Sequence, residues 1–382
     1  RLRRAGAVIL GKTVTTPFAC FDPAETRNPW GEDRTPGGSS SGSAAAVATG
    51  MCPAAIGTQT GGSIIRPATY CGVCGFKPSY GTVSLEGVFP VAASLDHVGP
   101  IARTVEDLAC LFAVMADGSP FDAAGRRATG QSRRTRDVGP HDMRAFTTDA
   151  LQAGSAPDRP LFEDLLTNRL TASFPIGQPP RIGVLEEYFL SHAEASVETA
   201  FQDALSRFEK FGAPVQTLEP PMPISEILDN HRTIMAAEAA AVHSPRFRET
   251  PDEYPPRLQE LIRHGLSLPA AAYILAKQHQ RRTRDRLTRL FEDVDLLACP
   301  ATPGPAPDRS STGDPRFNSP WSYVGFPTVS FPIAFAPSRL PLGVQIVGPF
   351  GADSRLLRHA AWCEKAVGFE TPSPQGDRPG GQ

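Results

Sequence analysis

The sequence has no long hydrophobic run and no marked excess of either charge. Its longest apolar run covers residues 270–276, well short of the roughly 20 residues that span a membrane as a helix. The 38 basic and 40 acidic residues leave a net charge of −2, so no overall field attracts nucleic acid or an anionic membrane. The chain opens on RLRRAG, with neither an initiator methionine nor the apolar stretch of a secretory leader.

Lysine is scarce and cysteine is scattered. Five of the 38 basic residues are lysines, which limits the side chains that could serve as a catalytic amine. An odd, dispersed set of seven cysteines is typical of a reducing compartment and predicts a cytoplasmic protein. Cys71 and Cys74 form a single CxxC motif without the second pair or the spaced histidines of a zinc site. We therefore interpret them as two small core residues and expect no metal and no cofactor.

Short apolar runs alternate with amphipathic stretches along the chain, which predicts an α/β fold. We expect a mixed β-sheet core surrounded by α-helices in a single domain over residues 1–370. The 39 prolines and 34 glycines indicate many turns but stay below the share that is typical of disorder. The expected strands are residues 7–10, 53–57, 181–185, 214–218, 295–299, 328–332 and 343–347. The expected helices are residues 43–48, 104–116, 197–208, 270–294 and 356–367.

Two segments depart from this pattern, and one helix start carries a capping motif. Residues 118–180 mix arginines with glycine, serine and threonine without periodicity, which predicts a variable insert or loop. Residues 371–382 are rich in proline and glycine and are predicted to be a disordered tail. Ser191 and Glu194 have the spacing of a capping box at the start of the helix over residues 197–208.

Two loops rich in glycine and serine are the strongest candidates for a functional site. The first is PGGSSSGS, residues 36–43, and the second is GTQTGGSIIRP, residues 57–67. Clustered backbone amides of this kind can stabilise an oxyanion beside a serine. A flexible linker is an alternative for the first loop, but a predicted core helix follows it at once. The second loop has Ser63 where a phosphate-binding P-loop needs lysine.

Two other forms of serine catalysis fit poorly. Gly38, Ser40 and Gly42 match the GxSxG nucleophile elbow, but no strand precedes them. None of the eight histidines stands in a context diagnostic of a Ser-His-Asp triad, including His97, which follows Asp96. What remains is serine chemistry without histidine, in which a second serine relays the proton toward an amine base.

With these two loops, the sequence resembles the amidase signature family of Ser–cis-Ser–Lys hydrolases. The resemblance covers roughly residues 1–117 and 181–367. It is carried by TPGGSSSGSAAAV (35–47), GTQTGGSI (57–64), CGVCGFKP (71–78), SLDHVGP (94–100) and AVILGKT (7–13), with weaker matches in DLLACPAT (295–302), residues 321–332 and LPLGVQ (340–345). It implies the amidase signature fold and hydrolysis of a carboxamide to a carboxylate and ammonia or an amine.

The resemblance also assigns roles to individual residues. It implies that Ser63 is the nucleophile that becomes acylated and that Ser39 is the bridging serine on a cis peptide. The backbone amides of Thr60, Gly61 and Gly62, with that of Ser63, correspond to the oxyanion hole. Arg66 could bind a substrate carboxylate through its planar fork of donors, but a structural ion pair is the favoured interpretation.

The sequence departs from the family pattern at the base. The family's catalytic lysine lies on a segment well upstream of the first loop, whereas Lys12 and Lys77 match other positions of the family. We therefore expect an N-terminally truncated member whose activity is impaired, since a positioned base contributes about 10²–10⁴-fold to a rate. Gln59 stands where many members carry aspartate, which we interpret as subfamily variation.

Three functions remain open at this stage. The favoured one is a stand-alone amidase with a small-molecule amide substrate. The others are the glutaminase subunit of a tRNA-dependent amidotransferase, which needs a partner subunit, and a non-catalytic fragment. No direct nucleic-acid partner and no membrane partner is expected, and a homodimer is left open.

Overall fold

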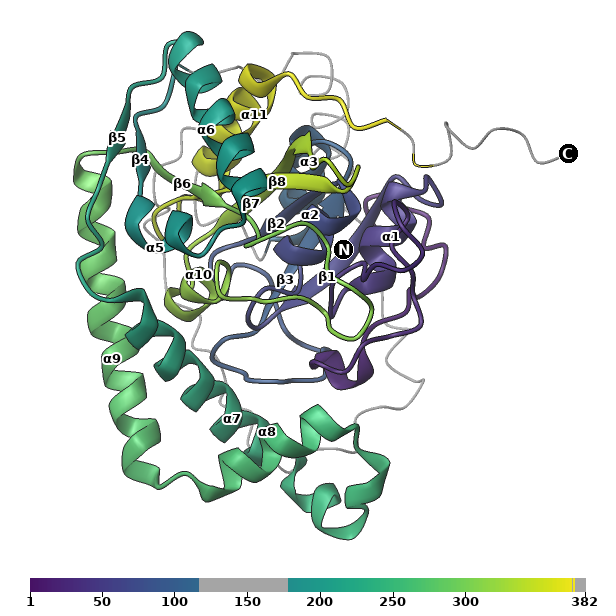
Figure 1. Cartoon of the computed structure of the whole chain (residues 1–382). Helices are drawn as coiled ribbons and strands as arrows, with labels where there is room; N and C mark the ends of the chain where they lie inside the picture. The colour runs from purple at the N-terminus through teal and green to yellow at the C-terminus, as the bar shows by residue number, and fades with distance from the viewer. Residues whose placement is uncertain (117–177, 373, 375–382) are drawn as a thin grey trace, which may run out of the picture.

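A computed structural model describes residues 1–116, 178–372 and 374. The chain folds around one sheet with helices on both sides (Figure 1). The segment predicted to be an insert lies outside the described residues apart from its last three positions, as does most of the tail.

The sheet has eight strands in the order β1-β3-β2-β7-β8-β6-β4-β5. Strand β4 runs parallel to both β5 and β6, and the other neighbours are antiparallel. The prediction of an α/β fold with a mixed sheet is therefore confirmed. The strands are β1 (Ala54–Gln59), β2 (Cys74–Lys77), β3 (His97–Ala102), β4 (Ile182–Val184), β5 (Val215–Thr217), β6 (Leu296–Pro300), β7 (Thr328–Phe335) and β8 (Pro341–Val347).

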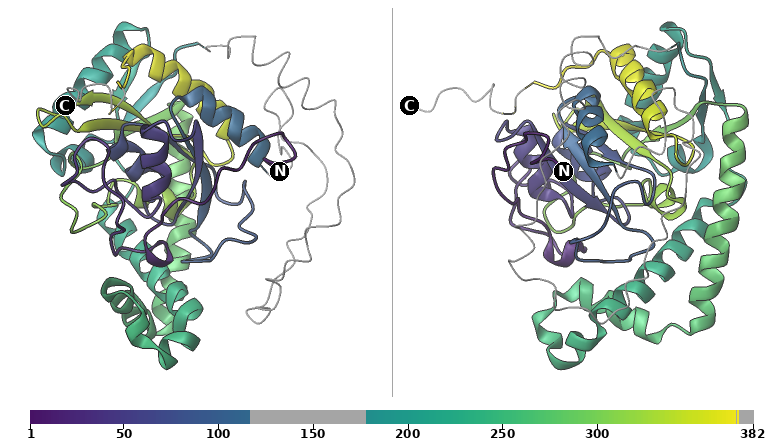
Figure 2. Two further views of the ribbon diagram at one scale, coloured as in Figure 1. Left: turned by 90° about the vertical axis from the view of Figure 1, so that its right-hand side faces the viewer. Right: turned by 180° about the vertical axis from the view of Figure 1, so that it is seen from behind.

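The helices form two main groups, which Figure 2 shows from the side and from behind. Helices α3, α6 and α11 share one hydrophobic core with β7 and β8. Helices α7, α9 and α10 belong to a second core, and α7 and α8 extend away from the sheet. The helices are α1 (Ser41–Ala48), α2 (Ile65–Cys71), α3 (Val105–Met115), α5 (Glu186–Ser191), α6 (Ala195–Lys210), α7 (Ile224–Glu249), α8 (Pro256–Ser267), α9 (Ala270–Thr288), α10 (Ser319–Val324) and α11 (Asp353–Val367).

The β4–α6–β5 unit follows its sequence pattern closely, apart from its capping motif. The four apolar residues spaced along α6 are buried, as the helical period predicts: Val197, Phe201, Leu205 and Phe208. The predicted capping box is wrong. Ser191 is the last residue of α5, where its hydroxyl donates to the carbonyl of Tyr188, and Glu194 itself is the N-cap of α6.

The predicted strand at residues 7–10 is wrong. These residues form no strand, and Val8 and Leu10 are 82% and 71% exposed. A hydrophobic run becomes a strand only where a neighbour offers its hydrogen bonds. Within the described residues, β1 is an edge strand that pairs with β3 alone.

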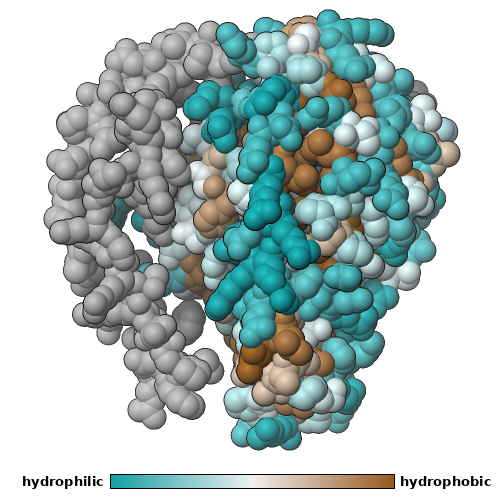
Figure 3. All heavy atoms as spheres, turned by 90° about the vertical axis from the view of Figure 1, so that its left-hand side faces the viewer, coloured by the Kyte–Doolittle hydropathy of each residue, from teal (hydrophilic) through white to brown (hydrophobic). Residues whose placement is uncertain are grey.

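The predicted helix over residues 270–294 forms as α9 but ends at Thr288, where a 3₁₀ turn continues to Glu292. The face of the molecule that carries α9 shows a band of hydrophilic side chains with a hydrophobic cluster near its lower end (Figure 3). Among the described helices, none combines the length and the apolar character needed to cross a membrane.

Candidate active site

The fold brings the two serine loops together. Ser39 lies just before α1, and Ser63 lies just before α2. Strand β1 connects the two elements, and Ser40 holds the loops against each other. The Ser40 amide donates to the carbonyl of Ser63 (3.4 Å), and the Ser40 hydroxyl accepts from the Thr58 amide (3.1 Å).

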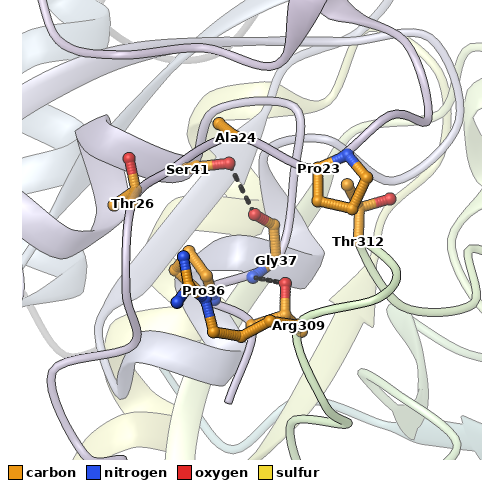
Figure 4. Close-up of a pocket in the computed structure, with 9 residues that line it drawn as sticks. Pro23, Ala24, Thr26, Pro36, Gly37, Ser41, Arg309 and Thr312 are labelled. Atoms are coloured by element: carbon orange, nitrogen blue, oxygen red, sulfur yellow. Dashed lines mark hydrogen bonds between the residues drawn. The ribbon is translucent and has the colours of Figure 1, made fainter. Parts of the chain in front are cut away.

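The peptide bond between Gly38 and Ser39 is cis, in agreement with the family resemblance. The turn that leads to it has no room for side chains. At Gly37, which has a φ of +81°, an added Cβ would lie 2.7 Å from the Cα of Pro67. The Ser41 hydroxyl donates to the Gly37 carbonyl (2.7 Å), and this turn lines a small hollow beside Thr312 (Figure 4).

Both serine hydroxyls are available for chemistry. Ser39 is 2% exposed and Ser63 is half-buried. Within the part of the chain that the structure describes, neither hydroxyl bonds to another protein group. The amides of Gly61, Gly62 and Ser63 likewise have no protein acceptor among the described residues. The loop therefore presents free N–H groups next to a free hydroxyl, which is the arrangement that an oxyanion hole requires.

Gln59 fixes the start of the helix that follows the nucleophile loop. Its side-chain oxygen accepts from the amides of Ile64 (2.8 Å) and Ile65 (3.0 Å), and its nitrogen donates to the Ser322 hydroxyl (3.0 Å). An aspartate is one methylene shorter and cannot donate. The departure from the family pattern at this position thus adds a bond to α10.

Asp96 holds the loop from the other side. One of its oxygens accepts from the Thr60 hydroxyl (2.5 Å), and the other accepts from the amides of Val91 and Ala92. Burial raises the pKa of Asp96 to about 6, although the bond from Thr60 opposes this shift. The SLDHVGP motif alone did not indicate this role of Asp96, because the contact joins residues 36 positions apart.

Gly62 packs against a side chain that the sequence did not single out. A Cβ at Gly62 would lie 2.6 Å from Oδ1 of Asn318, an atom that accepts no hydrogen bond in the described structure. The amide nitrogen of Asn318 donates to the Ala301 carbonyl and to Gln345. The side chain is therefore fixed in place, and only glycine fits against it.

Arg66 is buried and forms no ion pair among the described residues, so the favoured prediction of a structural ion pair is wrong. Its Nη2 donates to the carbonyl of Gly38 (2.8 Å) and to the Thr312 hydroxyl (3.3 Å). Its Nε and Nη1 have no partner in the described part of the chain, and burial lowers its pKa. Arg66 thus contacts the cis peptide directly and keeps two donors unused.

Lys77 is fully buried on β2 beside the site. Its amine donates to the carbonyls of Pro78 and Phe326, so it connects β2 to the segment that follows α10. Burial lowers its pKa from the ordinary value of 10.5 to about 7, partly opposed by the charge of Asp353.

Lys77 should make stability depend on pH. Between pH 7 and 10.5 the unfolded chain binds a proton at Lys77 that the folded chain does not, so stability rises with pH in this window. As the pH rises through this window, the free energy of unfolding of the wild type should therefore increase relative to that of Lys77→Met by up to about 1.4 kcal/mol per pH unit. Urea titrations measure it, with the exposed Lys210→Met as control. A difference between wild type and Lys77→Met that stays constant across this window contradicts the expectation.

Comparison with known proteins identifies the class. A sequence model of the family described as Amidase matches residues 1–139 and 172–357. The chain belongs to this family, and it is an amidase-family hydrolase that acts on C–N amide bonds.

Residues 71 and 74 are buried free cysteines, and no metal-binding group of side chains is found among the described residues.

Individual relatives refine the comparison. The chain is 32% identical over 403 residues to a glutamyl-tRNA(Gln) amidotransferase subunit from Thermus thermophilus, with 96% of this chain and 77% of the relative covered. The protein of the same name from Roseiflexus castenholzii is 35% identical over 414 residues, with 98% and 76% covered. A crystal structure described as an amidase superposes with a TM-score of 0.76 at 28% identity, with 95% and 76% covered.

Proposed function

We propose that the protein hydrolyses a small carboxamide through an acyl-Ser63 intermediate, with Ser39 as the proton relay. The observation that carries the proposal is that, among the described residues, neither the hydroxyls of Ser39 and Ser63 nor the amides of the Gly61–Ser63 loop bond to another protein group. The Ser40 contact between the loops and the bond from Arg66 to the Gly38 carbonyl support it, because both hold Ser39 beside the loop of Ser63.

The reaction balances as two steps. In the first, Ser63 Oγ bonds to the amide carbonyl carbon, and the carbonyl oxygen becomes an oxyanion that accepts from the amides of the loop. The proton of Ser63 passes to Ser39 Oγ, whose own proton passes to the substrate nitrogen, and the C–N bond breaks. In the second, water attacks the acyl ester, and its proton returns through Ser39 to Ser63 as the carboxylic acid leaves and ionises.

We propose that the chain alone turns over slowly. Lys12 is exposed and its amine bonds to the Thr13 carbonyl, while Lys77 donates to the two carbonyls named above. In the structure described, neither amine bonds to Ser39 or Ser63, and a positioned base is worth about 10²–10⁴-fold in rate.

A fluorophosphonate tests the nucleophile, because Ser63 Oγ displaces fluoride from phosphorus through the same oxyanion geometry. We expect intact mass spectrometry to show a single adduct on the wild type and on Ser43→Ala, and no adduct on Ser63→Ala. Ser43 is the matched control because it lies on α1 near Ser39 and its hydroxyl bonds to the Ile56 carbonyl. An adduct that persists in Ser63→Ala, or folded protein that never labels, overturns the proposal.

A second candidate is the glutaminase subunit of an amidotransferase, favoured by the names of the relatives at 32–35% identity. Hydrolysis of glutamine that appears only with a co-purified partner subunit would support this candidate. Hydrolysis of simple carboxamides such as propionamide by the isolated chain would support the stand-alone amidase.

The free thiols of all seven cysteines support our proposal that the protein works in the cytoplasm.

A further inference from the structure

Four successive carbonyls of the nucleophile loop all accept hydrogen bonds from the protein. The Gln59 carbonyl faces His97 Nδ1 (3.3 Å), and the Thr60 carbonyl faces His231 Nε2 (2.9 Å). The Gly61 carbonyl accepts from the Ser322 hydroxyl (2.7 Å), and the Gly62 carbonyl accepts from the amide of Arg66 (2.9 Å). The donors come from β3, α7, α10 and α2.

These contacts determine the tautomer of both histidines. A carbonyl oxygen only accepts, so the ring nitrogen that faces it carries the proton. Burial lowers the pKa of both rings, which keeps them neutral. Within the described part of the chain, the other ring nitrogen of His97 is buried without a partner, as a neutral ring of this tautomer allows. Both rings therefore act as fixed N–H donors.

Each bond also acts on the amide across the same peptide group. A trans peptide is planar and points its N–H away from its carbonyl, so a donor behind the Thr60 carbonyl directs the Gly61 N–H to the opposite side. Hydrogen bonding to a carbonyl polarises the peptide and strengthens its N–H as a donor. The amides concerned are those of Thr60, Gly61, Gly62 and Ser63, the set that the family resemblance assigns to the oxyanion hole.

We propose that His231 is a positioning residue of the reaction, which orients and polarises the Thr60–Gly61 peptide as an oxyanion donor. This inference rests on the proposed function. The bond from His231 is 2.9 Å long, the residue is 4% exposed, and it reaches the loop from α7, 171 positions further along the sequence. The Ser322 hydroxyl donates in the same way to the carbonyl of the next peptide, Gly61–Gly62. The side chain of Gln59 in turn donates to Ser322 and holds it in place.

The test measures the Thr60–Gly61 peptide by NMR as well as the reactivity of Ser63. Four Thr–Gly peptides occur in the sequence, at Gly50, Gly61, Gly130 and Gly313, so labelling threonine carbonyls with ¹³C and glycine amides with ¹⁵N reduces the NMR spectrum to four amides, that of Gly61 among them. His231→Leu removes the donor, and His231→Gln keeps an N–H at a similar reach. His243→Leu is the control, because His243 is another buried histidine of α7 that faces Tyr254 instead.

We expect His231→Leu to shift the Gly61 resonance and leave that of Gly50 in place, and His231→Gln to restore it. Fluorophosphonate labelling of Ser63 should slow about tenfold in His231→Leu, less than the ~10²–10³-fold loss of a whole oxyanion donor. It should stay near the wild-type rate in His231→Gln and His243→Leu. A Gly61 resonance that does not respond in folded His231→Leu, or equal labelling rates, overturns the inference. A different result is that neither the wild type nor any variant reacts with the fluorophosphonate, while the Gly61 resonance still shifts in His231→Leu and returns in His231→Gln. In that case the positioning role of His231 stands and the proposed function fails.

Discussion

Ser39→Ala should slow labelling and hydrolysis at Ser63 by about 10²–10⁴-fold, the usual worth of a positioned proton-transfer group. The reason is that Ser39 lies buried beside the loop of Ser63 with its hydroxyl unengaged, so its loss removes the relay without removing any bond of the fold. The thermal midpoint should therefore change little. Second-order rates of fluorophosphonate labelling, measured for wild type and variant at matched protein concentration, give the ratio.

Ser43→Ala provides the contrast to Ser39→Ala. Ser43 bonds to the Ile56 carbonyl and to Thr13 (2.8 Å each), so its replacement should lower stability modestly and leave the labelling rate near that of the wild type. The relay hypothesis fails if Ser39→Ala labels as fast as the wild type, or if its loss of rate follows only from a loss of folded protein.

Gly62→Ala should reduce labelling of Ser63 by about 10²–10³-fold, comparable with the loss of one oxyanion donor. The added methyl would lie 2.6 Å from Asn318 Oδ1 and 3.2 Å from the Cβ of Asn318, so the loop must move. Because Asn318 donates to Ala301 and Gln345, it cannot yield freely. We also expect a stability loss of about 1–3 kcal/mol from overpacking, measurable by urea denaturation.

The double variant Gly62→Ala with Asn318→Ala separates the clash from other effects of the alanine. Removing the Asn318 side chain makes room for the methyl, so the two substitutions should be strongly non-additive in both rate and stability. Gly11→Ala is the matched glycine control, because a Cβ added at Gly11 would have no described atom within 4 Å. Additive losses in the double variant would show that the contact with Asn318 is not the cause.

Local pattern predicted much of the fold. The buried stripe of α6 and the buried strand β4 before it follow from spacing alone, since one face of a helix and a run of apolar residues must both be buried. Strand β5 forms where it was predicted but lies largely exposed at the edge of the sheet. Residues 7–10 show the limit of this reasoning. Their composition favours a strand, but a strand also needs a partner, and the position of β1 at the sheet edge is a property of the whole topology.

The candidate site likewise contains residues that a local sequence pattern predicts and residues that only tertiary packing brings in. The serines and the amide loop could be proposed from GTQTGGSI and PGGSSSGS, because their residue types are close together in the sequence. His231 could not, since it lies within α7, a helix of 26 residues in which no motif marks that position. Asn318 lies just before α10 and contacts Gly62 only through tertiary packing. Such partners become visible only when the loop has a surrounding structure.

The separation of 171 positions between Thr60 and His231 also sets an order of events during synthesis. A ribosome completes both serine loops long before it makes α7, and α10 comes later still. The loop that exposes Ser63 therefore waits for its carbonyl donors until most of the chain has been translated. A nascent chain that ends before α7 would carry Ser63 without the donor that His231 provides to the Thr60 carbonyl. Under the proposed function, reactivity toward a fluorophosphonate should therefore report complete folding of the site.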